Sequence, residues 1–265
     1  MNDVFAFHQG NTPLLVSVPH DGRRLPDDLQ CRMTDVGIDI PDTDWHVAEL
    51  YAFVRDMGAS MIVADYSRYV VDLNRSSTDE ELYTGQWVTG LCPMQTFAGQ
   101  EIYVDGEVID RADMAQRIER YWRPYHGKLS AVLDQLREEH GHALLWDAHS
   151  IPSELPRLFA GKLPVLNLGT NDDRSCDKRI TDEIMRVVED SAYSSVRNGR
   201  FKGGFITRTY GKPDRGVQAL QLELAQRSYM DEVTRHFDNA KAAKLRDTLQ
   251  RILETYVTVA SRSVV

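Results

Sequence analysis

The chain has 265 residues, a length that suits one single-core domain covering residues 1–265. Its 31 basic and 40 acidic side chains give a net charge of −9, which disfavours nucleic acids and anionic membranes as partners because like charges repel. No apolar run reaches the roughly 20 residues that a membrane span needs, and the N-terminus lacks the pattern of a signal peptide.

Three short apolar runs in the first half of the chain predict buried strands, at residues 14–18, 59–64 and 69–73. After the first of these, apolar residues at helical spacing predict a helix from Trp45 to Gly58. Asp42 or Asp44 is suited to cap the start of that helix. The segment 78–106 is rich in Gly, Thr and Pro and has no clear period, and long segments of this kind are often functional.

The second half of the chain alternates strands with helices. Helical periodicity predicts helices at residues 111–139 (broken near Pro124), 179–190 and 236–257. Apolar runs predict strands at residues 143–146, 165–168, 205–207 and 219–224. This alternation is typical of an α/β domain whose mostly parallel or mixed sheet is flanked by helices on both faces. Functional sites in such folds lie at the carboxyl ends of the strands.

Polar side chains that can bind a metal follow several of the apolar runs. His20 follows LLVSVP, Asp147 and His149 follow ALLW, and Glu223 follows ALQL. Because Asp147 and His149 are two residues apart on a strand, their side chains share a face. Two imidazoles and one carboxylate are typical of a catalytic metal site that leaves a position for water. The alternative is that each histidine is an ordinary polar residue at a strand end, since the sequence does not show that the two meet.

Eight segments of the chain resemble, in order, the motifs of N-formylglutamate amidohydrolases: SVPHDG, DTDWHVAELY, SRYVVDLNR, LCPMQTF, WDAHSIP, LNLGT, GGFITRTYGKP and LQLELAQRSYM. The resemblance extends from about His20 to Tyr229. That family is similar to the zinc carboxypeptidases and aspartoacylases, so the resemblance implies a zinc-carboxypeptidase-like (phosphorylase/hydrolase-like) fold. It also implies a deformylase that hydrolyses N-formyl-L-glutamate to formate and L-glutamate, the last step of one route of histidine degradation.

The resemblance implies roles for particular residues. His149 and Ser150 are similar to the second zinc-histidine motif of the peptidases, Asn74 and Arg75 to their substrate-carboxylate clamp, and Glu223 to their catalytic glutamate.

The first metal-binding motif departs from the peptidase pattern. The peptidases take a carboxylate three residues after the first histidine, but here that residue is Arg23, which cannot bind a cation. The carboxylate must come from elsewhere, and Asp44 is preferred over Asp42 and Asp21.

We therefore expect one divalent ion held by His20, Asp44 and His149. Zinc suits these ligands, and iron, cobalt and manganese are alternatives. Glu223 would take a proton from water and return it to the leaving nitrogen. Asp147 would fix the tautomer of a ligand imidazole, or bind the ion itself.

A small acidic N-acyl amino acid needs cationic groups to bind its carboxylates, and arginine does so in bidentate fashion. Arg75 is the first candidate, and Arg68 and Arg208 come next. The alternative for each is an ion pair with a structural acid such as Asp72. The family usually shows a histidine where this chain has Thr209, a departure that bears on specificity.

Several other features point to structural roles or leave alternatives open. His46 and His126 are interpreted as structural, and so are the aromatic residues Trp45, Tyr51, Trp122 and Tyr125. The three cysteines lack CxxC spacing, which argues against disulfides and a cysteine zinc site and favours a cytoplasmic location. Alternative functions are a sibling metal-dependent deacylase or carboxypeptidase-like hydrolase with another acidic substrate, and a non-catalytic metal- or ligand-binding module. A homo-oligomer and closure of segment 78–106 over the site also remain open.

Overall fold

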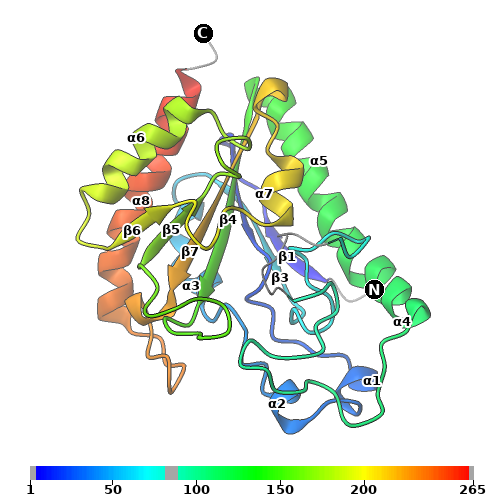
Figure 1. Ribbon diagram of the computed structural model, residues 1–265. Coiled ribbons are helices and arrows are strands. Elements are labelled where there is room, and N and C mark those ends of the chain that lie inside the picture. Colours follow the sequence, from blue (N-terminus) through cyan, green and yellow to red (C-terminus); the bar gives the residue numbers. More distant parts are fainter. Residues whose placement is uncertain (1–3, 81–88, 263–265) are drawn as a thin grey trace.

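The computed structural model describes residues 4–80 and 89–262 (Figure 1). Within these residues, seven strands form one mixed sheet in the order β1-β3-β2-β4-β7-β5-β6. The strands are β1 (Phe5–His8), β2 (Leu14–Val18), β3 (Ser60–Ala64), β4 (Ala143–Ile151), β5 (Leu166–Gly169), β6 (Ser195–Arg197) and β7 (Val217–Ala225). The central strands β3, β2, β4 and β7 run parallel, while β1 and β5 pair antiparallel with β3 and β7.

Helices cover both faces of the sheet (Figure 1). Helices α6 (Lys178–Glu189) and α8 (Asn239–Ser261) pack on one face, and α5 (Arg123–His140) packs on the other. The shorter helices are α1 (Asp27–Gln30), α2 (Asp35–Ile38), α3 (Val47–Leu50), α4 (Arg111–Arg117) and α7 (Phe205–Tyr210). Helical turns of other types are η1 (Ala52–Arg55), η2 (Ile118–Trp122), η3 (Pro213–Arg215) and η4 (Gln226–Ser228). No helix among the described residues has the length and apolar character needed to cross a membrane.

Alternation along the strands divides the core into two apolar layers. In β4, Leu144, Trp146 and Ala148 join the layer beneath α6 and α8, whereas Ala143 and Leu145 join the layer beneath α5. The same alternation occurs in β2 and β7, because successive side chains of a strand point to opposite faces. The sheet therefore presents two faces to two helical layers, and the predicted α/β architecture is confirmed.

The strands predicted at residues 14–18, 59–64, 165–168 and 219–224 and the helices at 179–190 and 236–257 are confirmed to within a few residues. Strand β4 runs to Ile151 instead of ending at Trp146, so Asp147 and His149 lie within the strand. The predicted helix from Trp45 to Gly58 is shorter, and consists of α3 and the 3₁₀ turn η1. The break near Pro124 takes the form of a π-helical turn, η2, directly before α5.

Two predicted strands are wrong. Residues 69–73 are buried but form turns, because their carbonyl oxygens bind side chains instead of a neighbouring strand. The oxygen of Tyr69 accepts from the Tyr103 hydroxyl, and that of Val70 from Arg117. Residues 205–207 begin helix α7, and their short apolar run has no period that separates strand from helix.

Candidate active site

The register of the three central strands gathers polar residues at their carboxyl ends. Ser17 of β2 pairs with Asp147 of β4, and Asp147 pairs with Gln221 of β7. Two residues further along each strand, His149 pairs with Glu223. Each of these residues is an even number of positions away from a residue of the same strand that faces α5, so its side chain lies on that face of the sheet. The register therefore brings the second histidine beside the glutamate, although 74 positions separate them in the sequence.

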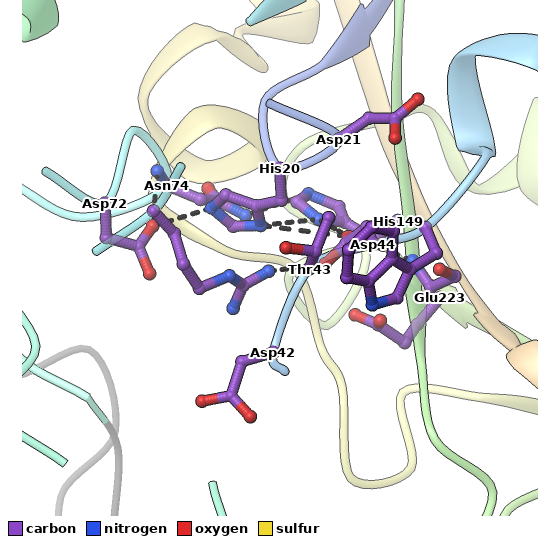
Figure 2. A network of polar contacts seen from close by, with 12 residues as sticks. His20, Asp21, Asp42, Thr43, Asp44, Asp72, Asn74, His149 and Glu223 are labelled. Atoms are coloured by element: carbon purple, nitrogen blue, oxygen red, sulfur yellow. Dashed lines mark hydrogen bonds and ion pairs between the residues drawn. The ribbon is translucent and has the colours of Figure 1, made fainter. Parts of the chain in front are cut away.

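His20 and His149 converge, as Figure 2 shows. Their Nδ1 atoms lie 3.2 Å apart, and their ring centroids 4.9 Å apart. The Oδ2 atom of Asp44 lies 3.1 Å from Nδ1 of His149 and 3.8 Å from Nδ1 of His20. All three side chains are buried. Two nitrogens and one oxygen thus form a compact triangle.

The triangle has the dimensions of a metal site. Four ligands at the 2.0–2.2 Å typical of zinc lie about 3.3–3.6 Å from one another in a tetrahedron. The three observed separations, 3.1, 3.2 and 3.8 Å, are centred on this range. Imidazole and carboxylate are also the donors that zinc and similar divalent cations accept. The residues present therefore fit one divalent ion with three protein ligands.

Asp44 is held in place by backbone contacts and by an arginine. Its amide N–H donates to the His20 carbonyl oxygen over 3.0 Å, and its Oδ2 accepts from the Ser150 amide over 3.0 Å. Arg68 donates to its Oδ1 over 2.5 Å. Burial alone would raise the pKa of Asp44, but the Arg68 charge and the histidine hydrogen bonds outweigh burial and hold it well below its usual range. Asp44 is therefore an anion at neutral pH.

Each imidazole also has an outer carboxylate partner. Nε2 of His20 lies 2.8 Å from Oδ1 of Asp72, and Nε2 of His149 lies 3.1 Å from Oδ2 of Asp147. Ser17 donates to the other oxygen of Asp147 over 3.2 Å. In a neutral imidazole whose proton is on Nε2, beside the carboxylate, Nδ1 has no proton, and Nδ1 is the atom that each ring turns toward the triangle. Although burial opposes charge, Asp147 and Asp44 raise the pKa of His149 well above its ordinary value.

Asn74 connects the two imidazoles to helix α7. Its backbone N–H donates to Oδ1 of Asp72 over 2.8 Å, and its Oδ1 accepts from the Ile206 amide over 2.8 Å. The second contact fixes the orientation of the amide, so Nδ2 donates to Asp147 Oδ2 over 3.4 Å and lies 3.0 Å from His149 Nε2. The segment 72–74 therefore orients both rings.

Glu223 lies beside the triangle and is buried (Figure 2). Gln221 Nε2 donates to its carboxylate over 3.4 Å. Burial raises the pKa of Glu223 to about 8, with the His149 charge opposing and the Asp44 charge reinforcing the change. A carboxyl group with a pKa near neutrality can both accept and release a proton at physiological pH.

A cavity opens onto these residues. His20, His149 and Glu223 lie along it, together with three arginines, Arg68, Arg75 and Arg200. The cavity lining is therefore rich in positive charge although the chain is acidic overall, which suits an anionic ligand.

Arg75 is held firmly at the cavity. Its Nε and Nη2 donate to the carbonyl and hydroxyl oxygens of Thr89, over 2.8 and 3.0 Å, and its Nη1 donates to the Asn74 carbonyl oxygen.

Other predicted site residues lie elsewhere. Asp21 accepts from the amides of His46 and Ala48 and thus caps α3, the role predicted for Asp42 or Asp44. Asp42 accepts from the Tyr69 hydroxyl and the Phe97 amide. Figure 2 shows the carboxylates of Asp21 and Asp42 directed away from the triangle.

Two positions on helix α7 also lie outside the cavity lining. Arg208 donates from Nε to the Gly203 carbonyl oxygen, and Thr209, the departure from the family pattern, is exposed.

His46 and His126, which were interpreted as structural from the sequence, make contacts outside the triangle. His46 lies at the start of α3 and its Nε2 contacts the Arg235 carbonyl oxygen. His126 bridges the Leu73 carbonyl oxygen and the Tyr210 hydroxyl, at 2.8 and 2.9 Å.

Segment 78–106 contributes Thr89 and Phe97 to the cavity. Its residues 81–88 lie outside the described part of the chain, so whether the segment closes over the site stays open.

Sequence reasoning missed Asp72, Gln221 and Arg200. The alternation of β7 was a signal for Gln221, which is two residues before Glu223 and so shares its face. Asp72 and Arg200 lie in irregular segments, where no periodicity indicates what a side chain faces.

Comparisons with known proteins agree with this geometry. A family model for N-formylglutamate amidohydrolase matches residues 12–230. An N-formylglutamate deformylase from Pseudomonas putida is 50% identical over 233 residues, which are 88% of this chain and 87% of that protein. One from Pseudomonas aeruginosa is 44% identical over 257 residues, 96% of both chains.

Solved structures show the same relationship. The crystal structure of N-formylglutamate amidohydrolase from Ralstonia eutropha JMP134 superimposes with a TM-score of 0.83 at 26% identity, covering 98% of this chain and 99% of that one. A protein from Agrobacterium tumefaciens shares the fold, with a TM-score of 0.74 at 15% identity over 96% of both chains. The resemblance found in the sequence motifs is thus confirmed, and the chain belongs to the N-formylglutamate amidohydrolase family.

Proposed function

We propose that residues 1–265 act as one amidohydrolase domain that hydrolyses N-formyl-L-glutamate to formate and L-glutamate with one divalent metal ion, zinc in the first instance. The observation that carries this proposal is the buried triangle of His20, Asp44 and His149 beside Glu223 in one arginine-lined cavity. Family membership and the names of the Pseudomonas relatives support the choice of substrate.

His20, Asp44 and His149 would hold the ion through two Nδ1 atoms and one carboxylate oxygen. When bound, a divalent cation supplies Lewis acidity, which polarises a carbonyl group and makes water a stronger acid. Asp72 and Asp147, at 2.8 and 3.1 Å from the two Nε2 atoms, would hold the Nε2 protons of the neutral imidazoles and so keep both Nδ1 lone pairs available. Arg68 keeps Asp44 ionised at neutral pH.

Glu223 is the proton carrier in this proposal. It accepts a proton from the attacking water and returns it to the amide nitrogen as the C–N bond breaks. Its raised pKa supports the second role, because a carboxyl group that binds a proton more tightly than usual still holds that proton when the nitrogen becomes basic. Gln221 donates to the carboxylate and limits the directions in which it points.

Arg75 binds a substrate carboxylate in this proposal, and its position supports that role. It follows Asn74, whose amide lies beside His149, and it lines the same cavity as His149 and Glu223. Three hydrogen bonds hold the guanidinium in one orientation before substrate arrives, which lowers the entropy lost on binding. Asn74 would help to position the substrate from the same segment.

Removal of the metal and mutation of Glu223 test the proposal together. Dialysis against a chelator should abolish hydrolysis of N-formylglutamate, and zinc, cobalt or manganese should restore it to different degrees. Glu223→Gln should retain metal, measured by elemental analysis, while kcat falls about 10²–10⁴-fold because general acid–base catalysis is lost. N-acetyl- and N-carbamoylglutamate, assayed in parallel, define the acyl group. Full activity after complete removal of metal, or in Glu223→Gln, would refute this assignment of roles.

A further inference from the structure

Arg200 lies in the loop between β6 and α7, a part of the cavity wall to which no function has yet been assigned. The loop is held against the sheet by short backbone contacts. Asn171 donates to the Lys202 carbonyl oxygen over 2.6 Å, and Gly204 donates to Oε1 of Gln221 over 2.6 Å. Because Gln221 also contacts Glu223, the position of this loop is tied to the catalytic strand β7.

Arg200 contacts two residues of the cavity wall. Its Nε donates to the Leu158 carbonyl oxygen over 2.8 Å, and its central carbon lies 5.5 Å from the centroid of the Phe201 ring. Leu158, Phe201 and Ile151 line the same cavity and pack in one small apolar cluster. Arg200 therefore presents its charge at an apolar wall, which suits a ligand with methylene groups that end in an anion.

A dicarboxylate needs two cationic partners, and the cavity offers three arginines. Arg68 is 7% exposed and donates to Asp44 over 2.5 Å, so it belongs to the proposed metal site. Arg75 and Arg200 are the other two arginines among the described residues that line the cavity. Arg75 follows directly on Asn74, which contacts His149, whereas Arg200 lies by the apolar wall.

We propose that Arg200 binds the side-chain carboxylate of the substrate and so sets the preference for an acidic amino acid, an inference that rests on the proposed hydrolysis of N-formylglutamate. In the substrate, the α-carboxylate is attached to the carbon that bears the reacting nitrogen, and the side-chain carboxylate is three carbons from it. The nearer carboxylate then pairs with Arg75. The two methylene groups pack on Ile151, Leu158 and Phe201, and the farther carboxylate reaches Arg200.

N-formyl-L-glutamine tests this assignment, because it has nearly the shape of N-formyl-L-glutamate without the side-chain charge. kcat/KM is measured for both substrates with wild type, Arg200→Met, Arg200→Lys and Arg75→Met. Arg200→Met should lower kcat/KM about 100-fold for N-formylglutamate, as expected when one partner of a charged pair is removed, and only a few-fold for N-formylglutamine. Arg75→Met should lower both values by a similar factor, because both substrates carry the α-carboxylate.

Arg174→Met is the matched control. Arg174 also donates from Nε to a backbone carbonyl oxygen, but its side chain is 67% exposed and does not line the cavity. It should leave the ratio of the two kcat/KM values unchanged. Thermal unfolding and metal content, measured for every variant, identify any general loss of structure.

The ratio of the two kcat/KM values decides the inference. Equal losses of kcat/KM on both substrates in Arg200→Met, or no loss on either, would overturn the inference about Arg200. The proposed function would still hold in that case, provided that the wild type hydrolyses N-formylglutamate. If Arg200→Met does not fold, Arg200→Lys replaces it, because lysine keeps the charge but lacks the planar fork. A ratio of kcat/KM for N-formylglutamate to kcat/KM for N-formylglutamine below that of wild type supports the inference, and a ratio equal to that of wild type overturns it. A wild type that hydrolyses neither substrate would refute the proposed function itself.

Discussion

Substitution of Gly204 by alanine tests whether the geometry of the two imidazoles depends on close packing beneath helix α7. A Cβ atom at this position would lie 2.3 Å from Nδ2 and 2.6 Å from Cγ of Asn74. Gly204 has no room to retreat, because its amide is bound to Gln221 over 2.6 Å. The backbone conformation itself tolerates alanine, since its φ is −82°. The clash with Asn74 is therefore the main consequence of the substitution.

The size of the effect follows from these distances. Non-bonded heavy atoms prefer about 3.5 Å, so Asn74 must move by about 1 Å. Such a shift strains its contacts with Ile206, His149 and Asp147, which lie at 2.8, 3.0 and 3.4 Å. Overpacking of this kind destabilises by about 1–3 kcal/mol. A displacement of about 1 Å at a catalytic group can lower the rate about 100-fold, so we expect a loss of that order in kcat/KM.

The assay combines urea unfolding with kinetics on N-formylglutamate. Gly127→Ala is the matched control, because a Cβ there meets nothing within 4 Å. Within α5 it should stabilise by about 0.5–1 kcal/mol without changing activity. In an Asn74→Ala background, Gly204→Ala should have little further effect, because its clash partner is gone. Wild-type kinetics in Gly204→Ala, or strictly additive losses in the double variant, would refute this reasoning.

Three further predictions follow from the site. Asp72→Asn should weaken zinc affinity about 10–100-fold in a chelator competition, because His20 loses its charged partner; unchanged affinity would exclude that role. Asp21→Ala should lower the free energy of unfolding by roughly 1 kcal/mol, because α3 loses its cap, while the affinity for zinc stays unchanged. A fall in zinc affinity would indicate that Asp21 is a metal ligand. Burial lowers the pKa of His126 to about 4. As pH falls below about 6.5, His126 becomes protonated in the unfolded chain but stays neutral in the folded chain. The free energy of unfolding therefore declines by roughly 3 kcal/mol down to pH 4. The gap in unfolding free energy between wild type and His126→Gln should therefore narrow toward pH 4, and a constant gap would contradict this assignment.

Much of the sheet could be predicted from the sequence, because its central strands are continuous apolar runs bounded by turns. Residues 14–18 and 219–224 were recognisable for this reason, and so was the position of polar residues at the strand ends. Since parallel strands present their carboxyl ends to one edge, His20, His149 and Glu223 could be identified as one group from their places along the chain. The family motifs directed attention to the same residues.

Other features depended on contacts between distant parts of the chain. Residues 69–73 have the composition of a strand, yet they form turns because side chains of Tyr103 and Arg117, more than 30 residues away, bind their carbonyl oxygens. Residues 205–207 form the first turn of a helix, and the side-chain oxygen of Asn74 accepts a hydrogen bond from the Ile206 amide in that turn. In both cases the local sequence is compatible with two conformations, and the tertiary partner selects one.

The same limit applies to the choice among carboxylates. Asp21, Asp42 and Asp44 were all candidate ligands from the sequence, and Asp42 and Asp44 were also candidate caps of the following helix. Only the folded chain separates them, because the Ser150 amide and Arg68 hold Asp44 beside the imidazoles while the amides of α3 take Asp21. The sequence alone determined which chemical groups are present and which strands the polar residues His20, His149 and Glu223 follow. The tertiary structure decided which groups meet, because hydrogen bonds between residues far apart in the chain leave no periodic signal along it.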